Sequence, residues 1–159
     1  MSTRAPTVET DQVRPFLTPP QLVLFRQLQP FEQRHAFKVL SALMTSGQKD
    51  PDLLKASLLH DIGKIHYPLS IWERVLIVVM KRIFPGLAQK WGQETPQGLS
   101  KPFVVAFHHA EWGADLAARA GTTKFCIDLI RRHEDSPLEK TVSRKDRLLL
   151  LLQQADDSN

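Results

Sequence analysis

Apolar residues recur three and four positions apart in nearly every patterned segment of this chain, and that spacing restricts it to helices. In the first such segment Leu22, Phe25 and Leu28 fall on one side of a helix that Thr18 can cap. No segment alternates apolar and polar residues between hairpin turns, which is the pattern of a half-buried strand. The sequence therefore predicts an all-α fold, built as a compact helical bundle.

Capping residues, prolines and glycines set the expected boundaries of the helices. Ser, Thr, Asp or Pro opens most of the apolar segments, and Gly or Pro closes several of them. The expected helices cover residues 18–28, 30–47, 50–63, 70–84, 102–120, 122–133 and 143–157. The segment 102–120 is compatible with one helix or with two short ones.

The length of the chain supports a single domain, because 159 residues suffice for one hydrophobic core and are too few to expect two. We predict that residues 1–16 are disordered and that residues 17–159 form this domain. The polar stretch 92–101, which contains glycine and proline, is also expected to be disordered.

The composition narrows the setting and the partners of the chain. Cys126 is the only cysteine, so no internal disulfide can form, and the first residues lack the apolar stretch of a signal peptide. These two features predict a cytoplasmic protein. The net charge is only +4 and no block of like charges occurs, so specific nucleic acid binding is not expected. The most apolar segment, 71–84, falls short of the roughly 20 apolar residues that a membrane-spanning helix needs.

Six polar side chains interrupt the apolar helical stripes or lie at their ends. Two of them are adjacent, since His60 and Asp61 follow the apolar pair Leu58–Leu59. A buried imidazole must be hydrogen-bonded and a buried carboxylate must be paired, so a shared metal ion would explain several of both. Imidazole nitrogens and carboxylate oxygens suit divalent ions, and one carboxylate can bridge two of them. The six candidates are His35, His60, Asp61, His109, His133 and Asp156.

Several of these side chains also have a simpler explanation without a metal. Gly63 could be the left-handed residue that ends a helix, with Lys64 near the free carbonyl groups and His60 near the negative helix end. His35 could bond a backbone carbonyl, His133 could be a cation at a helix end, and Asp156 could lie in a solvated tail.

The order and surroundings of the six side chains match a known pattern. Residues 58–64 read Leu-Leu-His-Asp-Ile-Gly-Lys, and His35 with Val39 matches an opening His-x-x-x-Val. His109 begins a second motif, His-Ala-Glu-Trp-Gly-Ala, and a further histidine and a closing aspartate follow, namely His133 and Asp156. From residue 35 to residue 157 the chain resembles the HD superfamily of metal-dependent phosphohydrolases, whose all-helical domain gathers such groups around one or two metal ions.

The resemblance implies two adjoining ion sites that share one carboxylate. The first ion is expected to bind four side chains, namely His35, His60, Asp61 and Asp156. The second ion is expected to share Asp61 and to bind two further histidines, His109 and His133. One or two divalent ions are expected, and Mn, Fe, Zn, Mg and Ni are not distinguished.

The resemblance also implies the reaction, which is the hydrolysis of a nucleotide or another small phosphoester by metal-activated water. Asp61 and Lys64 are the expected catalytic residues, and Lys64, Arg131 and Arg132 are the expected contacts to the phosphate. Two glutamates are candidates to accept hydrogen bonds from ligand imidazoles, namely Glu111 and Glu134, with an outward-facing side chain as the commoner alternative. The His-His-Glu and Gly-Tyr-Pro signature of the cyclic-di-GMP phosphodiesterases is missing, which argues against that substrate.

Two of the ligand positions have a neighbour of the same type. His108 precedes His109, and because successive helical residues turn by roughly 100°, only one of them should face inward. We favour His109, although Ala rather than the usual Pro of the family follows it. Asp157 likewise follows Asp156 and is the alternative closing ligand.

A second hypothesis comes from the apolar segment 71–84. Six apolar residues form one stripe, namely Trp72, Val75, Leu76, Val79, Met80 and Ile83. Three more, Ile77, Val78 and Phe84, widen it beyond a single core-facing side. We expect the core of the protein to cover this stripe, with a homodimer contact or a peripheral membrane contact as alternatives. In the alternative cases the protein could be a non-enzymatic HD-fold binding or regulatory module that uses this helix for a protein or membrane partner.

Overall fold

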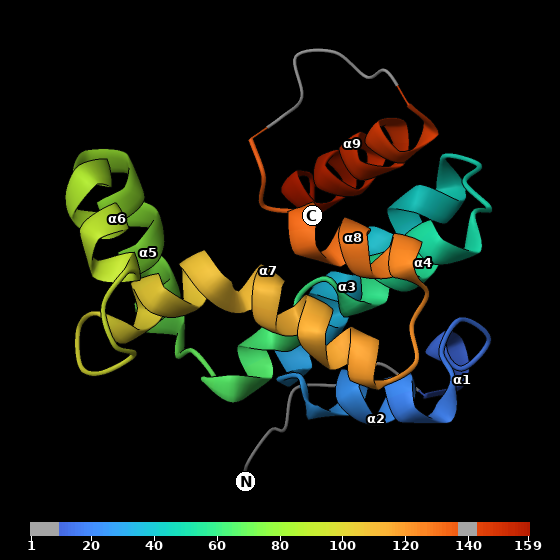
Figure 1. The fold of residues 1–159 in the computed structure, drawn as a ribbon, viewed down its shortest axis with the longest axis horizontal. Coiled ribbons are helices and arrows are strands. Elements are labelled where there is room, and N and C mark those ends of the chain that lie inside the picture. The colour runs from blue at the N-terminus through green and yellow to red at the C-terminus, as the bar shows by residue number, and fades with distance from the viewer. Residues whose placement is uncertain (1–9, 137–142) are drawn as a thin grey trace, which may run out of the picture.

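The computed structural model describes residues 10–136 and 143–159, which form nine α-helices and one 3₁₀ helix without any strand (Figure 1). This confirms the predicted all-α fold. In chain order the elements are α1 (Thr10–Val13), α2 (Pro19–Gln27), α3 (Pro30–Thr45), α4 (Pro51–Leu59), η1 (Ile62–His66), α5 (Ile71–Ile83), α6 (Pro85–Gly92), α7 (Lys101–Arg119), α8 (Lys124–Arg132) and α9 (Arg144–Asp157). Across the described residues, every helix is too short or too polar to span a membrane.

The starts of several helices agree with the capping residues in the sequence. The side chain of Asp50 accepts hydrogen bonds from two amides in the first turn of α4, and Thr123 accepts one from an amide of α8. Ser143 and Asp146 form a reciprocal capping box at α9. Because the first amides of a helix have no partner within it, these side chains determine where the helices begin.

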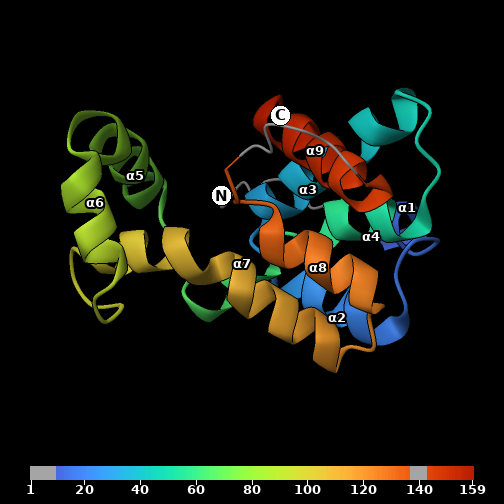
Figure 2. The same ribbon diagram turned by 45° about the horizontal axis from the view of Figure 1, so that its top comes forward.

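The hydrophobic core lies where α3, α4, α8 and α9 meet the C-terminal half of α7 (Figures 1 and 2). It includes Leu40, Leu58, Ile62, Leu129 and Leu152, none of them more than 1% exposed. Burying one such side chain stabilises the fold by roughly 1.5–3 kcal/mol. The core therefore holds in fixed positions the helices that carry the candidate ligands.

Helices α5 and α6 form an arm that projects from this core beside the N-terminal half of α7 (Figures 1 and 2). We refer to residues 71–92 as the arm. Trp91 of α6 packs on Phe103 of α7 with ring centroids 5.2 Å apart. At the base of the arm Arg74 pairs with the buried Glu32 of α3 at 3.1 Å. The segment 102–120, which the sequence left as one helix or two, is formed by the single helix α7. The sequence pattern does not predict α6.

Gly63 has a different role from the helix-ending one considered above. The predicted helix 50–63 divides into α4 and η1, and Gly63 is not among the described glycines with a positive φ, which are Gly47, Gly98 and Gly121. A Cβ atom at Gly63 would overlap the carbonyl oxygen of His109 and would lie 2.7 Å from the amide nitrogen of Gly113. The close crossing of η1 and α7, rather than a helix end, therefore requires glycine here.

The apolar side of α5 is not covered by the core, contrary to the expectation from the sequence. No residue of α5 is buried, and Trp72 is 81% exposed and Val78 68% exposed. An apolar helical stripe has the same sequence pattern whether its cover is the protein itself or something else, so the pattern alone could not decide this.

The segment for which we predict disorder divides in the structure. Residues 1–9 lie outside the described residues, whereas residues 10–16 contain α1, where Val13 is fully buried. The boundary at residue 17 stays a prediction. In the stretch 92–101 the hydroxyl of Ser100 donates to the carbonyl oxygens of Thr95 and Gln97, which gives this turn region its own hydrogen bonds.

Candidate metal centre

The six predicted ligand side chains converge on one place, although they come from five parts of the chain. α3, α7 and α9 each contribute one, the junction between α4 and η1 contributes an adjacent pair, and the residue after α8 contributes the last. They are His35, His109, Asp156, His60, Asp61 and His133. Their ligand atoms form three overlapping groups, within each of which all atoms lie within 4.8 Å of one another.

The first part of the centre contains two histidines and two aspartates. The Nε2 atom of His35 lies 2.7 Å from Oδ1 of Asp156, and Nε2 of His60 lies 3.4 Å from the same oxygen. Oδ2 of Asp61 lies 3.6 Å from Nε2 of His60. These four side chains are the ones that the resemblance assigns to the first ion.

The second part of the centre is built on the other oxygen of Asp61. Oδ1 of Asp61 lies 3.3 Å from Nε2 of His109 and 4.0 Å from Nε2 of His133, and the two Nε2 atoms lie 3.3 Å apart. Asp61 therefore turns one carboxylate oxygen toward each part. This is the arrangement that a carboxylate needs to bridge two ions.

Backbone carbonyl groups orient three of the ligand imidazoles. The Nδ1 atoms of His60, His109 and His133 lie 2.9, 3.0 and 2.7 Å from carbonyl oxygens of their own helices. A carbonyl oxygen can only accept, so each Nδ1 carries the hydrogen and donates it. In the neutral form of each ring, Nε2 then has a lone pair that points into the centre, as a metal ligand requires.

Two observations indicate that these residues fit a divalent ion, namely the type of their ligand atoms and one buried atom without a hydrogen-bond partner. His60 is fully buried, and within the described part of the chain its Nε2 has no hydrogen-bond partner. A buried polar atom without a partner is costly, and coordination to an ion would remove that cost. Imidazole nitrogens together with carboxylate oxygens suit Zn, Fe and Mn.

The charge state of Asp61 is fixed by its neighbours. Burial alone would raise the pKa of Asp61, but Lys64 and the imidazoles of His60 and His109 hold it well below its usual range. Nζ of Lys64 lies 2.7 Å from Oδ2 of Asp61. Burial would likewise lower the pKa of Lys64, and Asp61 more than reverses this. Lys64 is thus a charged member of the centre rather than the exposed cation at a helix end that we considered.

The two most buried imidazoles respond to their surroundings in opposite directions. Burial would lower the pKa of His60, but the carboxylates of Asp61 and Asp156 outweigh it and raise the pKa to about 9. For His133, burial and the neighbouring His60 and His109 lower the pKa to about 3. His133 is therefore not a helix-end cation at neutral pH, and the carboxylates that attract a proton to His60 would also attract a divalent cation.

The structure distinguishes the neighbouring candidates that the sequence left open. Nε2 of His108 donates to the carbonyl oxygen of Gly92 at 3.2 Å, and its ring stacks on Trp112, while His109 points into the centre. Asp156 contacts two ligand histidines, whereas Asp157 is exposed.

Both predicted phosphate-binding arginines take part in ion pairs. Nε of Arg131 lies 3.0 Å from each carboxylate oxygen of Glu111. Glu111 therefore supports an arginine, and not a ligand imidazole. Arg132 pairs with Asp128 of α8, with Asp135 in the turn after α8 and with Asp146 of α9. Their contact with a substrate stays a prediction.

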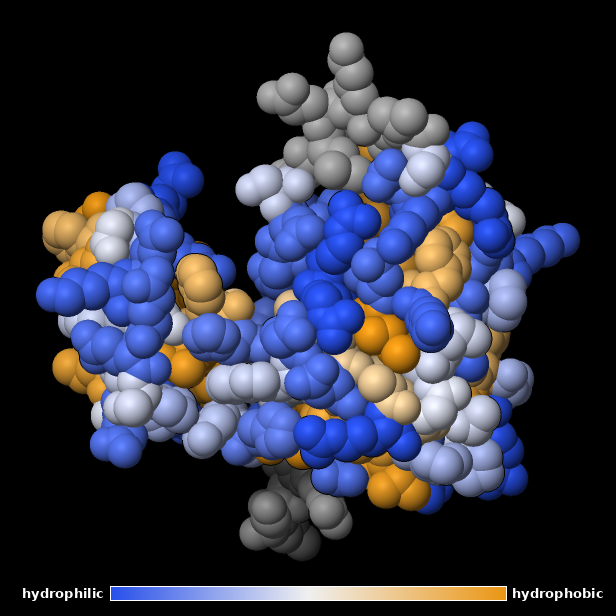
Figure 3. Space-filling view, viewed as in Figure 1, coloured by the Kyte–Doolittle hydropathy of each residue, from blue (hydrophilic) through white to orange (hydrophobic). Residues whose placement is uncertain are grey.

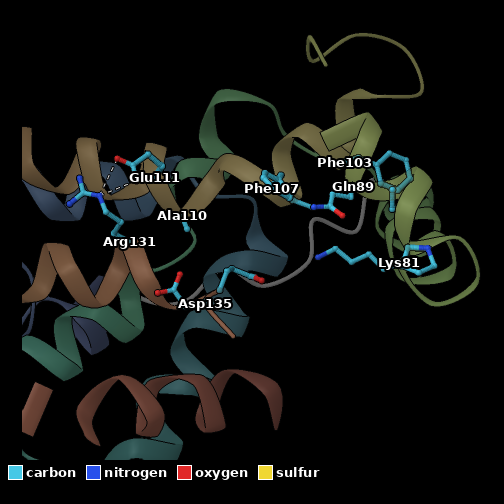
Figure 4. Close-up of a pocket in the computed structure, with 12 residues that line it drawn as sticks. Lys81, Gln89, Phe103, Phe107, Ala110, Glu111, Arg131 and Asp135 are labelled. Atoms are coloured by element: carbon cyan, nitrogen blue, oxygen red, sulfur yellow. Dashed lines mark hydrogen bonds and ion pairs between the residues drawn. The ribbon is translucent and has the colours of Figure 1, made fainter. Parts of the chain in front are cut away.

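Two cavities on the arm side of the centre share a lining residue that the sequence did not indicate for the site, Lys81. The smaller, of about 240 Å³, is lined by ligands and by Lys64, and the larger, of about 440 Å³, lies between the arm and the core (Figure 4). Both are lined by Lys81 and Glu134. Figure 4 shows Lys81 reaching from the arm toward the core. Ligands of the centre line the smaller cavity, and the two cavities share three lining residues, Lys81, Ala106 and Glu134.

Glu134 lies close enough to the second part of the centre to be a further ligand. Its Oε1 atom is 3.6 Å from Nε2 of His109 and 3.8 Å from Nε2 of His133. The only signal in the sequence is that Glu134 directly follows His133, and we predicted a supporting role for it instead. The sequence did not indicate Lys81 as a site residue, because the pattern of its helix indicates only an apolar stripe.

We expect His109→Ala to weaken metal binding by more than about 100-fold, since loss of groups that merely support a ligand already weakens it 10- to 100-fold. The measurement is a competition titration with a chromophoric chelator. His108→Ala is the matched control, because it removes an imidazole one residue away that lies outside the centre. Equal affinities of the two variants would contradict the choice of His109 as the ligand.

Comparison with known proteins agrees with this geometry. No curated protein and no solved structure matches the chain. The family model of the HD domain matches residues 33–158, a span that includes all six side chains of the centre. Since this match covers most of its length, the chain belongs to the HD domain family.

Proposed function

We propose that this protein is a phosphohydrolase that cleaves a nucleotide or another small phosphoester at the metal centre. The HD superfamily consists mostly of metal-dependent hydrolases, which supports a reaction of this class. The observation that carries the proposal is the position of Asp61, whose two oxygens face two separate sets of histidines. Two ions that share a carboxylate can act on both the attacking and the leaving oxygen of a phosphoester.

The ligand assignment follows the two parts of the centre. One ion would be held by four side chains, namely His35, His60, Asp61 and Asp156, and a second by Asp61, His109 and His133. Bound ions would supply a nucleophile by lowering the pKa of water and would neutralise charge on the phosphate.

The protein itself contributes cations at the entrance to the centre. Lys64 stands beside Asp61, where its ammonium group can meet a phosphate oxygen as a point charge. Lys81 lies on the other side of the space, on the arm, and lines both cavities (Figure 4). We propose that these two lysines orient the phosphate, with Arg131 at the far end of the larger cavity.

The size and lining of the cavities support a small substrate. Sites for small molecules commonly measure roughly 300–1,000 Å³ and combine apolar walls with a few polar groups. The smaller cavity has such walls, formed by Phe31, Leu69, Ile77 and Val78, and continues toward the larger one. A phosphoester with its phosphate at the metal centre would place its remaining part against these walls.

We expect gently purified protein to contain a divalent metal and to hydrolyse members of a panel of nucleotides and generic phosphodiesters. Metal analysis comes first, followed by the panel assayed with the metal found and with Mn, Fe, Zn, Mg and Ni in turn. Removal of the metal with a chelator should stop hydrolysis, and its return should restore it. Protein that is purified without metal and binds none of these ions would rule out the proposal.

A non-enzymatic module remains the second candidate, and the exposed apolar side of α5 favours it. Such a module would bind metal yet show no turnover on the panel with any of the ions. The same apolar side is also compatible with an enzyme that binds a partner.

A further inference from the structure

The arm presents an apolar face to solvent along one side of α5. Its members follow the spacing of a single helical stripe and are between 43% and 81% exposed. We call this the docking face and define it as Ile71, Trp72, Val75, Val78, Val79 and Ile83. Figure 3 shows apolar side chains along the outer edge of the arm.

The docking face is not the side of α5 that packs within the protein. Leu76, Ile77 and Met80 are less exposed than the members of the docking face, and Ile77 lies on the opposite side of the helix. α5 meets α6 and α7, and residues outside the docking face make most of its contacts with them. Contiguous apolar side chains that are left in water on a folded protein mark a site of interaction.

The charges around the docking face indicate what would cover it. The arm carries four basic residues and one acidic residue, Glu73. Glu73 is already engaged, since Nζ of Lys101 lies 3.1 Å from Oε1 and the amide of Ser70 donates to Oε2 at 2.7 Å. Lys81, Arg82 and Lys90 are exposed. A second copy of the arm would bring like charges together, whereas an anionic surface would attract them.

The dimensions of α5 fit a helix that lies in a membrane surface. With 13 residues it is about 20 Å long, and it is too short to span a bilayer. Trp72 lies near its start and Phe84 just after its end, and both are more than half exposed. A surface helix of this kind buries its apolar side at the level of the lipid headgroups, where tryptophan is favoured, and keeps basic residues near anionic lipids.

We propose that the docking face seats this protein on an anionic lipid bilayer, with α5 lying in the plane of the headgroups. Val78 belongs both to the docking face and to the wall of the smaller cavity, next to Ile77. The bound surface would therefore lie beside the mouth of the cavity that contains Asp61 and Lys64.

The test is cosedimentation of the full chain with vesicles of phosphatidylglycerol and phosphatidylcholine, and with vesicles of phosphatidylcholine alone. The protein is expected to pellet with the anionic vesicles and to be released by salt, which screens the attraction. Trp72→Gln combined with Ile83→Gln should lower partitioning by more than about 100-fold, because two large apolar side chains no longer insert. Arg82→Gln should lower it roughly fivefold, as expected for the loss of one basic residue near an anionic surface.

The matched control replaces two exposed apolar residues of the core helices, as Val23→Gln combined with Met44→Gln, and should bind vesicles like the unaltered protein. The metal-centre variant Asp61→Asn should also bind them normally, so the result does not depend on the proposed function. Failure of the unaltered protein to pellet, or equal pelleting of the arm and control variants, would overturn the proposal. A dimer that the arm variant converts to monomer in sedimentation equilibrium would also overturn it, because a second copy would then cover the face.

Discussion

Asp61→Asn is expected to remove both metal ions and to lower phosphoester hydrolysis by roughly 1,000-fold or more. Among the six side chains of the centre, Asp61 alone has one oxygen near each part, at 3.6 Å from Nε2 of His60 and 3.3 Å from Nε2 of His109. An amide retains the shape but offers one neutral oxygen in place of two charged ones, so it cannot bridge two cations. Ions in such a centre contribute several kcal/mol to catalysis, and about 4 kcal/mol corresponds to a factor of 1,000. Metal content is measured by mass spectrometry, and hydrolysis on the substrate found in the panel.

The matched control for this variant is Asp157→Asn, which makes the same chemical change in an exposed residue next to the ligand Asp156. The control should keep full metal content and full activity. Circular dichroism of both variants separates loss of the ions from loss of the fold. If Asp61→Asn kept two ions per chain, the bridging role of this carboxylate would be wrong.

Gly63→Ala is expected to destabilise the protein by about 3 kcal/mol, the upper part of the range for an overpacked interior. The added Cβ would overlap the carbonyl oxygen of His109 and approach the amide of Gly113, and both belong to the backbone of α7, which cannot move aside as a flexible side chain can. For a chain of this size the melting temperature should fall by about 6–12 °C. Because the displaced carbonyl belongs to His109, metal affinity should fall as well.

Gly86→Ala is the control for the glycine variant. No atom lies within 4 Å of a Cβ placed there, and Gly86 is within the helix α6, so alanine should leave stability unchanged or raise it by less than about 1 kcal/mol. Thermal unfolding followed by circular dichroism measures both variants. A Gly63→Ala protein that melts at the same temperature as the unaltered protein would show that η1 and α7 do not cross as closely as described.

Local interactions made much of the fold predictable from the sequence. A cap such as Ser143 with Asp146 lies within four residues, so the pattern that predicts it also contains its partner. The rotation of α7 about its own axis, in contrast, is not set by local interactions. His108 and His109 are adjacent, and only the packing of α7 on the rest of the protein decides that His108 bonds Gly92 while His109 faces the ligands.

The residues that the sequence misjudged depend on contacts that are remote in the chain. Gly63 was a candidate helix end because its neighbours resemble those of a helix end. Glycine is needed there because the backbone of α7, more than forty residues away in the chain, passes close to it. The apolar stripe of α5 was expected in the core, since periodicity identifies a buried side without identifying its cover. Lys81 and Glu134 were not predicted as neighbours of one cavity, because only the folded arm brings them together.

The hydrogen bonds from the imidazole Nδ1 atoms to backbone carbonyls have a thermodynamic consequence for the metal centre. Immobilising a side chain on binding typically costs about 0.5–1.5 kcal/mol, and most of that loss of rotamer entropy has already occurred here during folding. The fold therefore orients three ligand imidazoles before a metal ion binds, namely those of His60, His109 and His133. The cavity is made by the fold and not by the ion, in contrast to small domains that stay unfolded until they are metallated. Which element occupies it in the cell would then follow the supply of metals as much as the preference of the donors.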